Sequence, residues 1–305
     1  MKKELKFRQD GTFKILQFTD VHWVDGCEAD LRTSELMKKI LEEETPDLVV
    51  FTGDTVYGSH NETVLRRAVQ PVNGAEIPWA AVFGNHDAEV GAPKEALLRV
   101  QQESPLCLTE AGAPEVSGLG NYNLLIIGAA SGRPAWNLYF FDSGCLNTND
   151  RVEGYDYIKR DQIHWYAGLS GKVREQYGEI PALSFLHIPF PEYKEVWDFH
   201  TCYGEKNEEV CCPKQNSGLF SAMLEMGDVK GVFVGHDHIN DYWGELHGVR
   251  LCYGRATGYN TYGKEGFAHG ARVIVLKENE PGFETWIRLE DGAVVKNQPA
   301  HEPEG

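Results

Sequence analysis

The sequence predicts an α/β fold with two packed β-sheets, helices on the outside, and a dinuclear metal site at the carboxyl ends of the strands. Five short apolar runs lack polar alternation, as expected of strands that are buried on both faces. Helical patterns separate the early runs, which favours right-handed crossovers and a mainly parallel first half. A polar motif ends each run, and ligands bind at the carboxyl edge of such sheets.

The five runs are rich in β-branched and aromatic residues, which is typical of buried strands. The runs and the motifs that follow them are residues 14–19 before Asp20-Val21-His22, 47–52 before Gly53-Asp54, 79–83 before Gly84-Asn85-His86-Asp87, 183–186 before His187, and 231–234 before Gly235-His236-Asp237-His238.

Three helices are expected between the early strands. Residues 31–44 carry apolar side chains at helical spacing and stop at Thr45-Pro46. Residues 61–69 form a second pattern, with Asn61 as a candidate cap. Residues 93–102 form a third, with its proline suited to a first turn.

The later strands are expected to differ in direction. Residues 123–128 and 136–142 are separated by a short turn-like segment and predict an antiparallel pair. Residues 248–253 and 271–276 also have strand character.

One domain accounts for the whole chain, residues 1–305, with its core in about 13–276. The longest Gly/Pro-rich stretch, residues 111–120, is short enough for a surface loop. The charged segment 1–10 lacks an apolar secretion signal, and no run is long enough to span a membrane. Residues 297–305 predict a frayed polar tail.

The net charge of −17, from 29 basic and 46 acidic residues, argues against a nucleic-acid polymer as partner. A phosphate ester, either a small molecule or a phosphoprotein, stays compatible because bound metal ions reverse the local field. No membrane partner is expected.

Seven cysteines without a secretion signal favour reduced thiols and a cytoplasmic location. Cys202 and the adjacent Cys211-Cys212 raise the alternative of a small metal knot. Their spacing fits no zinc pattern, so unpaired cysteines are the favoured interpretation.

The motif residues supply carboxylates, imidazoles and one carboxamide. Two adjacent ions need a bridging ligand, for which Asp54 is the candidate. A mixed nitrogen and oxygen set favours manganese, iron or zinc over calcium or magnesium. The remaining candidate ligands are Asp20, His22, Asn85, His187, His236 and His238. Two such ions imply hydrolysis of a phosphate ester.

These motifs, in this order, resemble those of the calcineurin-like metallophosphoesterases over about residues 13–276. The resemblance implies a two-sheet sandwich and a hydroxide that bridges the two ions and attacks phosphorus. It implies that His86 binds no metal but stabilises the phosphate and protonates the leaving oxygen. It also implies two ligand sets: Asp20, His22, Asp54 and His238 for one ion, and Asp54, Asn85, His187 and His236 for the other.

Further segments resemble the purple-acid-phosphatase-like branch, which includes a yeast phosphatase that acts on phosphoproteins in stress signalling. One of them, residues 157–166, is similar to the helix that follows the middle strands in that branch. The other similar segments are residues 140–144, 235–241, 255–259 and 270–273.

Tyr57 departs from the calcineurin-type pattern, in which an Asp three residues after the bridging Asp orients the catalytic His. Purple acid phosphatases have Gly-Asp-x-x-Tyr with an iron-binding Tyr, but they lack the His that this chain has at position 22. Whether Tyr57 binds metal is therefore open.

Substrate-binding candidates are Asn85, His86, Tyr57, Arg255 and Tyr259. The aromatic residues 193, 197, 199 and 203 either wall the substrate site or pack on the domain. The other histidines, at positions 60, 164, 200, 247 and 269, are expected at the surface or with satisfied partners.

Monoester hydrolysis is the favoured function. A phosphodiesterase, for a cyclic nucleotide or another diester, uses the same metal set. A scaffold that has lost catalysis is the alternative of another class, although every expected ligand is present.

Overall fold

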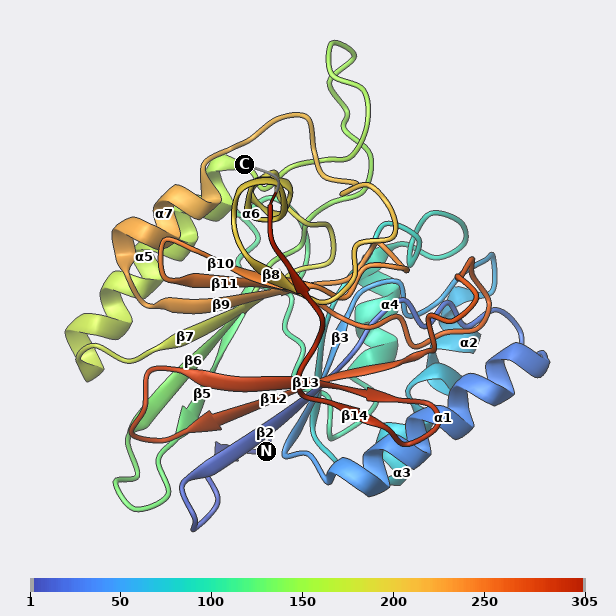
Figure 1. The fold of residues 1–305 in the computed structure, drawn as a ribbon, viewed down its shortest axis with the longest axis horizontal. Helices are drawn as coiled ribbons and strands as arrows, with labels where there is room; N and C mark the ends of the chain where they lie inside the picture. Colours follow the sequence, from blue (N-terminus) through green and yellow to red (C-terminus); the bar gives the residue numbers. More distant parts are fainter. Residues whose placement is uncertain (1–2, 304–305) are drawn as a thin grey trace.

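The computed structural model describes residues 3–303 and contains two β-sheets packed face to face, with helices on both outer faces (Figure 1). One sheet has nine strands in the order β1-β5-β6-β7-β9-β11-β10-β8-β15, and the other has six in the order β14-β13-β12-β2-β3-β4. The predicted α/β fold with two sheets flanked by helices is confirmed.

The six-stranded sheet contains the first three predicted strands as parallel neighbours. Leu16 of β2 pairs with Val49 of β3, which in turn pairs with Trp79 of β4. The other strands of this sheet run antiparallel to their neighbours. Its strands are β2 (Thr12–Phe18), β3 (Leu48–Thr52), β4 (Trp79–Val82), β12 (Gly270–Lys277), β13 (Phe283–Leu289) and β14 (Val294–Val295).

The nine-stranded sheet is mixed. The expected antiparallel pair is present as β5 and β6, while β6, β7, β9 and β11 are parallel neighbours. Its strands are β1 (Leu5–Lys6), β5 (Tyr122–Ile127), β6 (Pro134–Phe140), β7 (Ala182–Phe185), β8 (Cys202–Tyr203), β9 (Val229–Val234), β10 (Trp243–Leu246), β11 (Val249–Tyr253) and β15 (Ala300–His301).

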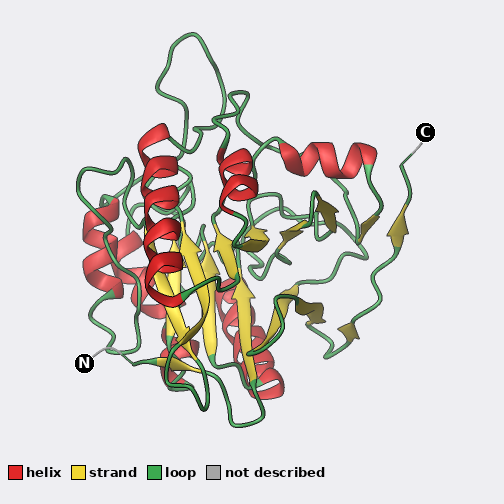
Figure 2. Cartoon of the chain, turned by 90° about the vertical axis from the view of Figure 1, so that its left-hand side faces the viewer, coloured by secondary structure: helices red, strands yellow, loops and turns green. Residues whose placement is uncertain are grey.

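The helices separate by sheet, as Figures 1 and 2 show. Side chains of α1, α2 and α4 share a core with the six-stranded sheet, whereas side chains of α5, α6 and α7 share one with the nine-stranded sheet. The helices are α1 (Glu28–Glu44), α2 (Asn61–Ala68), α3 (Gln70–Gly74), α4 (Lys94–Gln101), α5 (Arg160–Tyr177), α6 (Glu192–Phe199) and α7 (Leu219–Met226).

A third core lies between the two sheets, and it explains why the runs lack polar alternation. In β2, Ile15 belongs to the core between the sheets and Leu16 to the core beneath the helices. Val49 and Val50 of β3 divide in the same way. Each central strand therefore buries both of its faces.

The helix boundaries shift at their amino ends. Helix α1 begins at Glu28, before the predicted residue 31, because the Asp30 carboxylate accepts the backbone N–H groups of Asp25, Gly26 and Cys27. His60 holds the N-cap position of α2, and Asn61, the predicted cap, is the first helical residue. Pro93 precedes α4 instead of opening it.

The prediction of a frayed tail is wrong for the described part of residues 297–305. Ala300 pairs with Tyr203 of β8, and Gln298 is buried and donates a hydrogen bond to the Asp241 carbonyl oxygen. The two strands lie far apart in sequence, so no local pattern reveals their pairing. Residues 1–2 of the charged N-terminal segment and 304–305 of the tail lie outside the described residues.

None of the helices within residues 3–303 combines the length and the apolar character needed to cross a lipid bilayer.

Candidate metal centre

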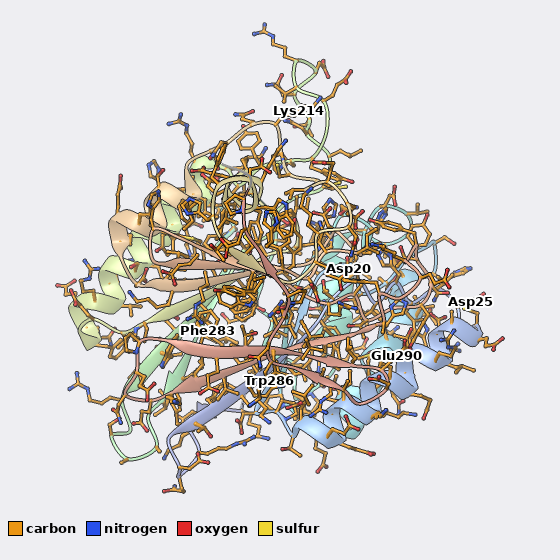
Figure 3. The ribbon with its side chains drawn as sticks, viewed as in Figure 1. Asp20, Asp25, Lys214, Phe283, Trp286 and Glu290 are labelled. Carbon is orange, nitrogen blue, oxygen red and sulfur yellow. The ribbon has the colours of Figure 1, made fainter. Side chains whose placement is uncertain are left out.

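The five motifs meet where the carboxyl ends of the strands that carry them, from both sheets, come together. Motif residues follow β2, β3 and β4 of one sheet and β7 and β9 of the other. The side chain of Gln17 joins the sheets beneath them, since its Nε2 donates to Thr52 Oγ1 at 2.8 Å and to the Val234 carbonyl at 3.0 Å. Figure 3 shows Asp20 inside the molecule and Asp25 near its periphery.

One cluster of metal-binding side chains consists of Asp20, His22 and His238, all buried. The Nε2 atoms of the two histidines are 3.3 Å apart, and His238 Nε2 lies 3.5 Å from Asp20 Oδ1. Three potential ligand atoms thus converge on one point.

The second cluster consists of Asp54, His187 and His236, also buried. His187 Nε2 is 3.2 Å from Asp54 Oδ2 and 3.3 Å from His236 Nδ1. Asn85 Oδ1 reaches the same nitrogen at 3.1 Å. His22 Nε2 of the first cluster lies only 3.6 Å from Asp54 Oδ2, so this oxygen faces both clusters.

Hydrogen bonding at Asp54 supports a bridging position. Its Oδ1 accepts the backbone N–H of His86 at 2.8 Å. Its Oδ2 is buried without a hydrogen-bond partner, as is Nε2 of His236. A buried carboxylate oxygen without a donor is costly unless a cation compensates it. The donor set and the unpartnered oxygen therefore fit two metal ions.

Outer contacts orient two of the histidines. His187 Nδ1 lies 2.8 Å from the Thr52 carbonyl oxygen, which can only accept, so Nδ1 carries a proton and Nε2 points into the cluster. His238 Nδ1 pairs with Thr261 Oγ1 at 2.7 Å, which leaves its Nε2 toward Asp20.

The electrostatics keep the carboxylates ionised and two of the imidazoles, those of His22 and His236, neutral. Burial lowers the pKa of His22 to about 4 and that of His236 to about 3. Burial also opposes the charge of His187, but Asp54 outweighs it and raises the pKa of His187 to about 9. Burial raises the pKa of Asp54, and the stronger effect of His187 and His22 holds it well below its usual range. Anionic and neutral donors together are what divalent ions require.

The cluster residues have unusual backbone conformations. Asp20, His22, Asp54 and His236 have positive φ angles of 52°, 47°, 48° and 79°. Non-glycine residues adopt this region rarely, and such conformations concentrate at functional sites. The chain therefore turns sharply after β2, β3 and β9, where these ligand residues stand.

Glycines next to the ligands allow this close approach. A Cβ at Gly84 would lie 2.1 Å from Asp54 Oδ1, and one at Gly235 would lie 1.9 Å from Thr19 Oγ1. At Gly53, φ is +89° and a Cβ would meet His187 Nδ1 at 2.5 Å. The glycine of each Gly-Asp, Gly-Asn and Gly-His pair is thus required sterically.

His86 lies at the edge of the clusters with a half-exposed side chain. Its ring centroid is 5.5 Å from that of His22 and 5.3 Å from that of Tyr57, whose ring it meets edge-on. Its Nδ1 lies 2.6 Å from Glu89 Oε2. Tyr57 is 44% exposed, so its ring forms part of the rim.

Asp87, the last residue of its motif, supports the loop. Its carboxylate accepts the backbone N–H groups of Asp54, Val56 and Gly84. Burial and then the charge of Asp54 raise the pKa of Asp87 to about 6.

Two of the substrate-binding candidates engage other partners. Arg255 is buried and its guanidinium binds Asp241 at 2.6 Å and the Ala268 carbonyl oxygen. Tyr259 donates its hydroxyl to Glu290, and its ring lies beneath the Arg32 guanidinium. These contacts give both side chains structural roles in the fold.

The aromatic residues after His187 mainly pack on the domain. Tyr193 is fully buried and donates to the Val232 carbonyl oxygen, and Trp197 stacks on His301 at 3.8 Å. Tyr203 stacks on Trp243. Phe199, at 73% exposed, does not share this packing.

The remaining histidines and the grouped cysteines lie outside the two clusters. Five other histidines are expected at the surface or with satisfied partners. None of them, at positions 60, 164, 200, 247 and 269, is buried. Cys202 is buried against the Val196 carbonyl oxygen, and the backbone N–H of Cys211 donates to Asp237. No candidate metal group within residues 3–303 includes Cys202, Cys211 or Cys212.

Sequence reasoning missed two tyrosines that cover the clusters. Tyr155 comes from the long loop between β6 and α5, which projects at the top of Figure 1, and its ring meets His236 edge-on at 4.4 Å. Tyr262 stacks on His238 at 4.3 Å and is 52% exposed. Neither belongs to a motif or follows a strand, so only the folded chain reveals them.

Comparison with known proteins agrees with this geometry. Residues 13–240 match the family described as calcineurin-like phosphoesterase. The "Probable inactive purple acid phosphatase 29" of Arabidopsis thaliana is 36% identical, with 95% of this chain and 85% of that protein covered. "Phosphatase DCR2" of Saccharomyces cerevisiae is 33% identical, with 94% and 55% covered.

Among solved structures, a dimetal phosphatase from Danio rerio has a TM-score of 0.60 at 15% identity, with 94% of this chain and 97% of that chain covered. This likeness supports the fold. The predicted resemblance to purple-acid-phosphatase-like proteins and a yeast phosphatase is confirmed by the relatives. The family match over most of the length, together with relatives more than 30% identical over nearly all of it, shows that the chain belongs to the calcineurin-like phosphoesterase family.

Proposed function

We propose that this protein is an active dinuclear metal-dependent phosphoesterase that prefers phosphate monoesters. The observation that carries the proposal is Asp54 Oδ2, a buried oxygen without a hydrogen-bond partner that lies within 3.6 Å of imidazole nitrogens from both clusters. An inactive relic of such a site has no need to retain an uncompensated buried carboxylate.

The proposed ligand sets follow the two clusters and share Asp54. One ion is held by Asp20, His22, Asp54 and His238, and the other by Asp54, Asn85, His187 and His236. When bound, two adjacent ions supply Lewis acidity and an activated water nucleophile. Manganese, iron and zinc suit this mixture of nitrogen and oxygen donors. Tyr57 is assigned to the rim, because it is 44% exposed and its ring lies beside that of His86.

His86 is the proposed general acid. Its backbone N–H binds Asp54 Oδ1, which fixes the imidazole beside the clusters without using a ring nitrogen. With Nδ1 paired to Glu89, Nε2 is left to deliver a proton to the ester oxygen as the P–O bond breaks. Asn85 and His86 are also the proposed contacts to the phosphate oxygens.

The substrate is a phosphate ester carried by a small molecule or a phosphoprotein. The net charge of −17 disfavours a nucleic-acid polymer. A cytoplasmic location, no membrane partner and reduced cysteines remain predictions from the sequence.

The scaffold alternative has one specific observation in its favour. The relative from Arabidopsis thaliana is named "probable inactive". In this chain, however, every residue of the expected ligand set is present and buried, and their ligand atoms gather in two adjacent clusters. The phosphodiesterase alternative needs the same set, so only the substrate preference separates it from monoester hydrolysis.

The test measures initial rates on p-nitrophenyl phosphate and bis(p-nitrophenyl) phosphate. The protein is stripped of metal and reloaded separately with manganese, iron or zinc, and His86→Ala serves as the matched blank. A faster rate on the monoester supports the proposal, and a faster rate on the diester moves the function to phosphodiesterase. Rates equal to those of His86→Ala with every metal would overturn the proposal of a general phosphatase and leave either a narrow substrate requirement or the scaffold alternative.

A further inference from the structure

The Glu89 carboxylate is the acidic group that contacts the imidazole of His86. Glu89 Oε2 lies 2.6 Å from His86 Nδ1, within hydrogen-bond distance. Tyr57 meets the His86 ring at 5.3 Å between centroids, with the two rings nearly perpendicular. We propose that Glu89 is a positioning residue that holds the His86 imidazole with Nε2 free for the substrate. The inference rests on the proposed function of the site.

The loop that carries both residues forms a turn. The backbone N–H of Glu89 donates to the His86 carbonyl oxygen at 3.3 Å. This turn brings the two side chains, three positions apart, to the same side of the loop. The turn thus places the carboxylate and the imidazole within reach of each other.

Asn61 of α2 clamps the far end of this loop. Its Nδ2 donates to the carbonyl oxygens of Asp87 and Ala92, and its Oδ1 accepts the Ala92 N–H, each at 2.9 Å. At Gly91, φ is +96° and a Cβ would lie 2.7 Å from Asn61 Oδ1, so the loop passes very close to the helix. The near end is fixed by the His86 N–H bond to Asp54.

The clamped loop has a chemical consequence. A carboxylate only accepts hydrogen bonds, so the contact with Glu89 places a proton on His86 Nδ1. The rings of Tyr57 and His22 bound the imidazole on other sides, at 5.3 and 5.5 Å between centroids. Rotation of the imidazole is restricted, and Nε2 becomes the nitrogen that can face a leaving group. As a general acid the ring carries a proton on both nitrogens: Nε2 gives its proton to the leaving oxygen, and the Nδ1–H tautomer that Glu89 holds in place remains.

The test compares Glu89→Gln with wild type in the metal-loaded protein on two monoesters. Phenyl phosphate has a poor leaving group that needs protonation, whereas p-nitrophenolate leaves readily without it. We expect kcat on phenyl phosphate to fall by about 10- to 100-fold, as when partners of functional histidines are removed, and kcat on p-nitrophenyl phosphate to fall much less. Metal content should not change.

A double-mutant cycle shows whether Glu89 acts through His86. In the His86→Ala background, Glu89→Gln should produce no further loss. Glu35→Gln is the matched control, because Glu35 also pairs with a residue three positions away, Lys38, at an exposed site. It should leave both rates unchanged. Exposed pairs of this kind contribute little to folding, so the melting temperatures of the single variants should be equal.

A readout without turnover follows the imidazole itself. In metal-free protein, at a pH where the His86 ring is neutral, nitrogen-15 NMR should show the Nδ1–H tautomer in wild type and a shift toward Nε2–H in Glu89→Gln. An active wild type with equal losses on both esters, an additive double mutant, or an unchanged tautomer would overturn the role of Glu89. A wild type as slow as His86→Ala would instead overturn the proposed function. The tautomer measurement would still show whether Glu89 contacts His86 Nδ1.

Discussion

The residues that form the clusters depend on glycines at their side. Gly84 leaves no space for a methyl group, because a Cβ there would lie 2.1 Å from Asp54 Oδ1 and 2.4 Å from its backbone nitrogen. Any side chain at this position must displace the carboxylate that faces both clusters. A side chain at position 84 should therefore disturb metal binding more than it disturbs the packing of the hydrophobic core.

We predict that Gly84→Ala lowers the metal content from two ions per chain and abolishes turnover while the chain still folds. The control is Gly171→Ala in α5, where a Cβ meets nothing within 4 Å. That change should keep both ions and add up to about 1 kcal/mol of stability, since alanine is the better helix former. Elemental analysis and thermal unfolding of both variants provide the test. Full metal occupancy in Gly84→Ala would contradict the steric argument.

Substitutions at two neighbouring residues, His86 and Asp54, should affect turnover and metal binding differently. His86→Ala removes the proposed proton donor but no proposed ligand, so kcat should fall by about 10²–10⁴-fold with metal content unchanged. Asp54→Asn removes the proposed bridge, so both should be lost. Metal analysis beside rate measurements checks this, and loss of metal in His86→Ala would show that its role has been misassigned.

At this scale the sequence predicts the cluster residues well but not the side chains around them. Asp20, Asp54 and His187 each end an apolar run, so their meeting follows from the strand pattern. Tyr155 and Tyr262 lie in loops without periodicity, and their contacts with histidines depend on tertiary structure. Arg255 also follows a strand, yet its guanidinium binds Asp241, a partner that the local sequence does not reveal.

Among the elements, α1 is tied to the six-stranded sheet by one buried carboxylate. Glu44, the last residue of α1 and 2% exposed, accepts hydrogen bonds from Lys14 of β2 and from Arg288 and Trp286 of β13. Burial alone would raise its pKa, but the bonds from Lys14 and Arg288 outweigh burial and lower the pKa below 4.5. The ionised form is therefore favoured in the folded state.

Glu44→Gln should destabilise the protein by about 1.5–3 kcal/mol at neutral pH, the range for hydrogen bonds to charged groups. Because the folded-state pKa is depressed, this stabilisation is fully present above the unfolded-state value of 4.5 and is lost as pH falls through the folded-state pKa. The difference in melting temperature between wild type and variant should therefore shrink below pH 4.5. A constant difference across pH would show that packing, and not charge, is responsible.

The elements themselves are predictable where burial leaves a pattern. The central strands are continuous apolar runs because cores lie on both of their faces. The pairing of β8 with β15 involves two-residue strands almost 100 residues apart, which is too short for any periodicity. Helix α1 begins early because Asp30 binds backbone groups ahead of it, a contact that apolar spacing does not report.

For the whole molecule, the clusters lie at the junction of the two sheets. Asp20 and Asp54 follow strands of the six-stranded sheet, and His187 and His236 follow strands of the nine-stranded sheet. Protein contacts already cross this junction, including the His187 Nδ1 bond to Thr52 and the backbone N–H of His236 on the Asp20 carboxylate. Ions held by ligands from both sheets would add a further link.

Metal removal should therefore lower the melting temperature of the entire domain, because an ion bound only by the folded state stabilises it by mass action. At a free metal concentration 100 times Kd, one site contributes about 2.7 kcal/mol, which corresponds to a rise of about 4 °C for a chain of 305 residues. Wild type is stripped by a chelator, dialysed, and melted with and without added manganese, and His86→Ala serves as the control that keeps every proposed ligand. Both proteins should show the metal-dependent rise, and Asp54→Asn should not. If stripping left the melting temperature of wild type unchanged while metal analysis confirmed loss of the ions, the centre would serve chemistry alone and the protein contacts would suffice to hold the sheets together.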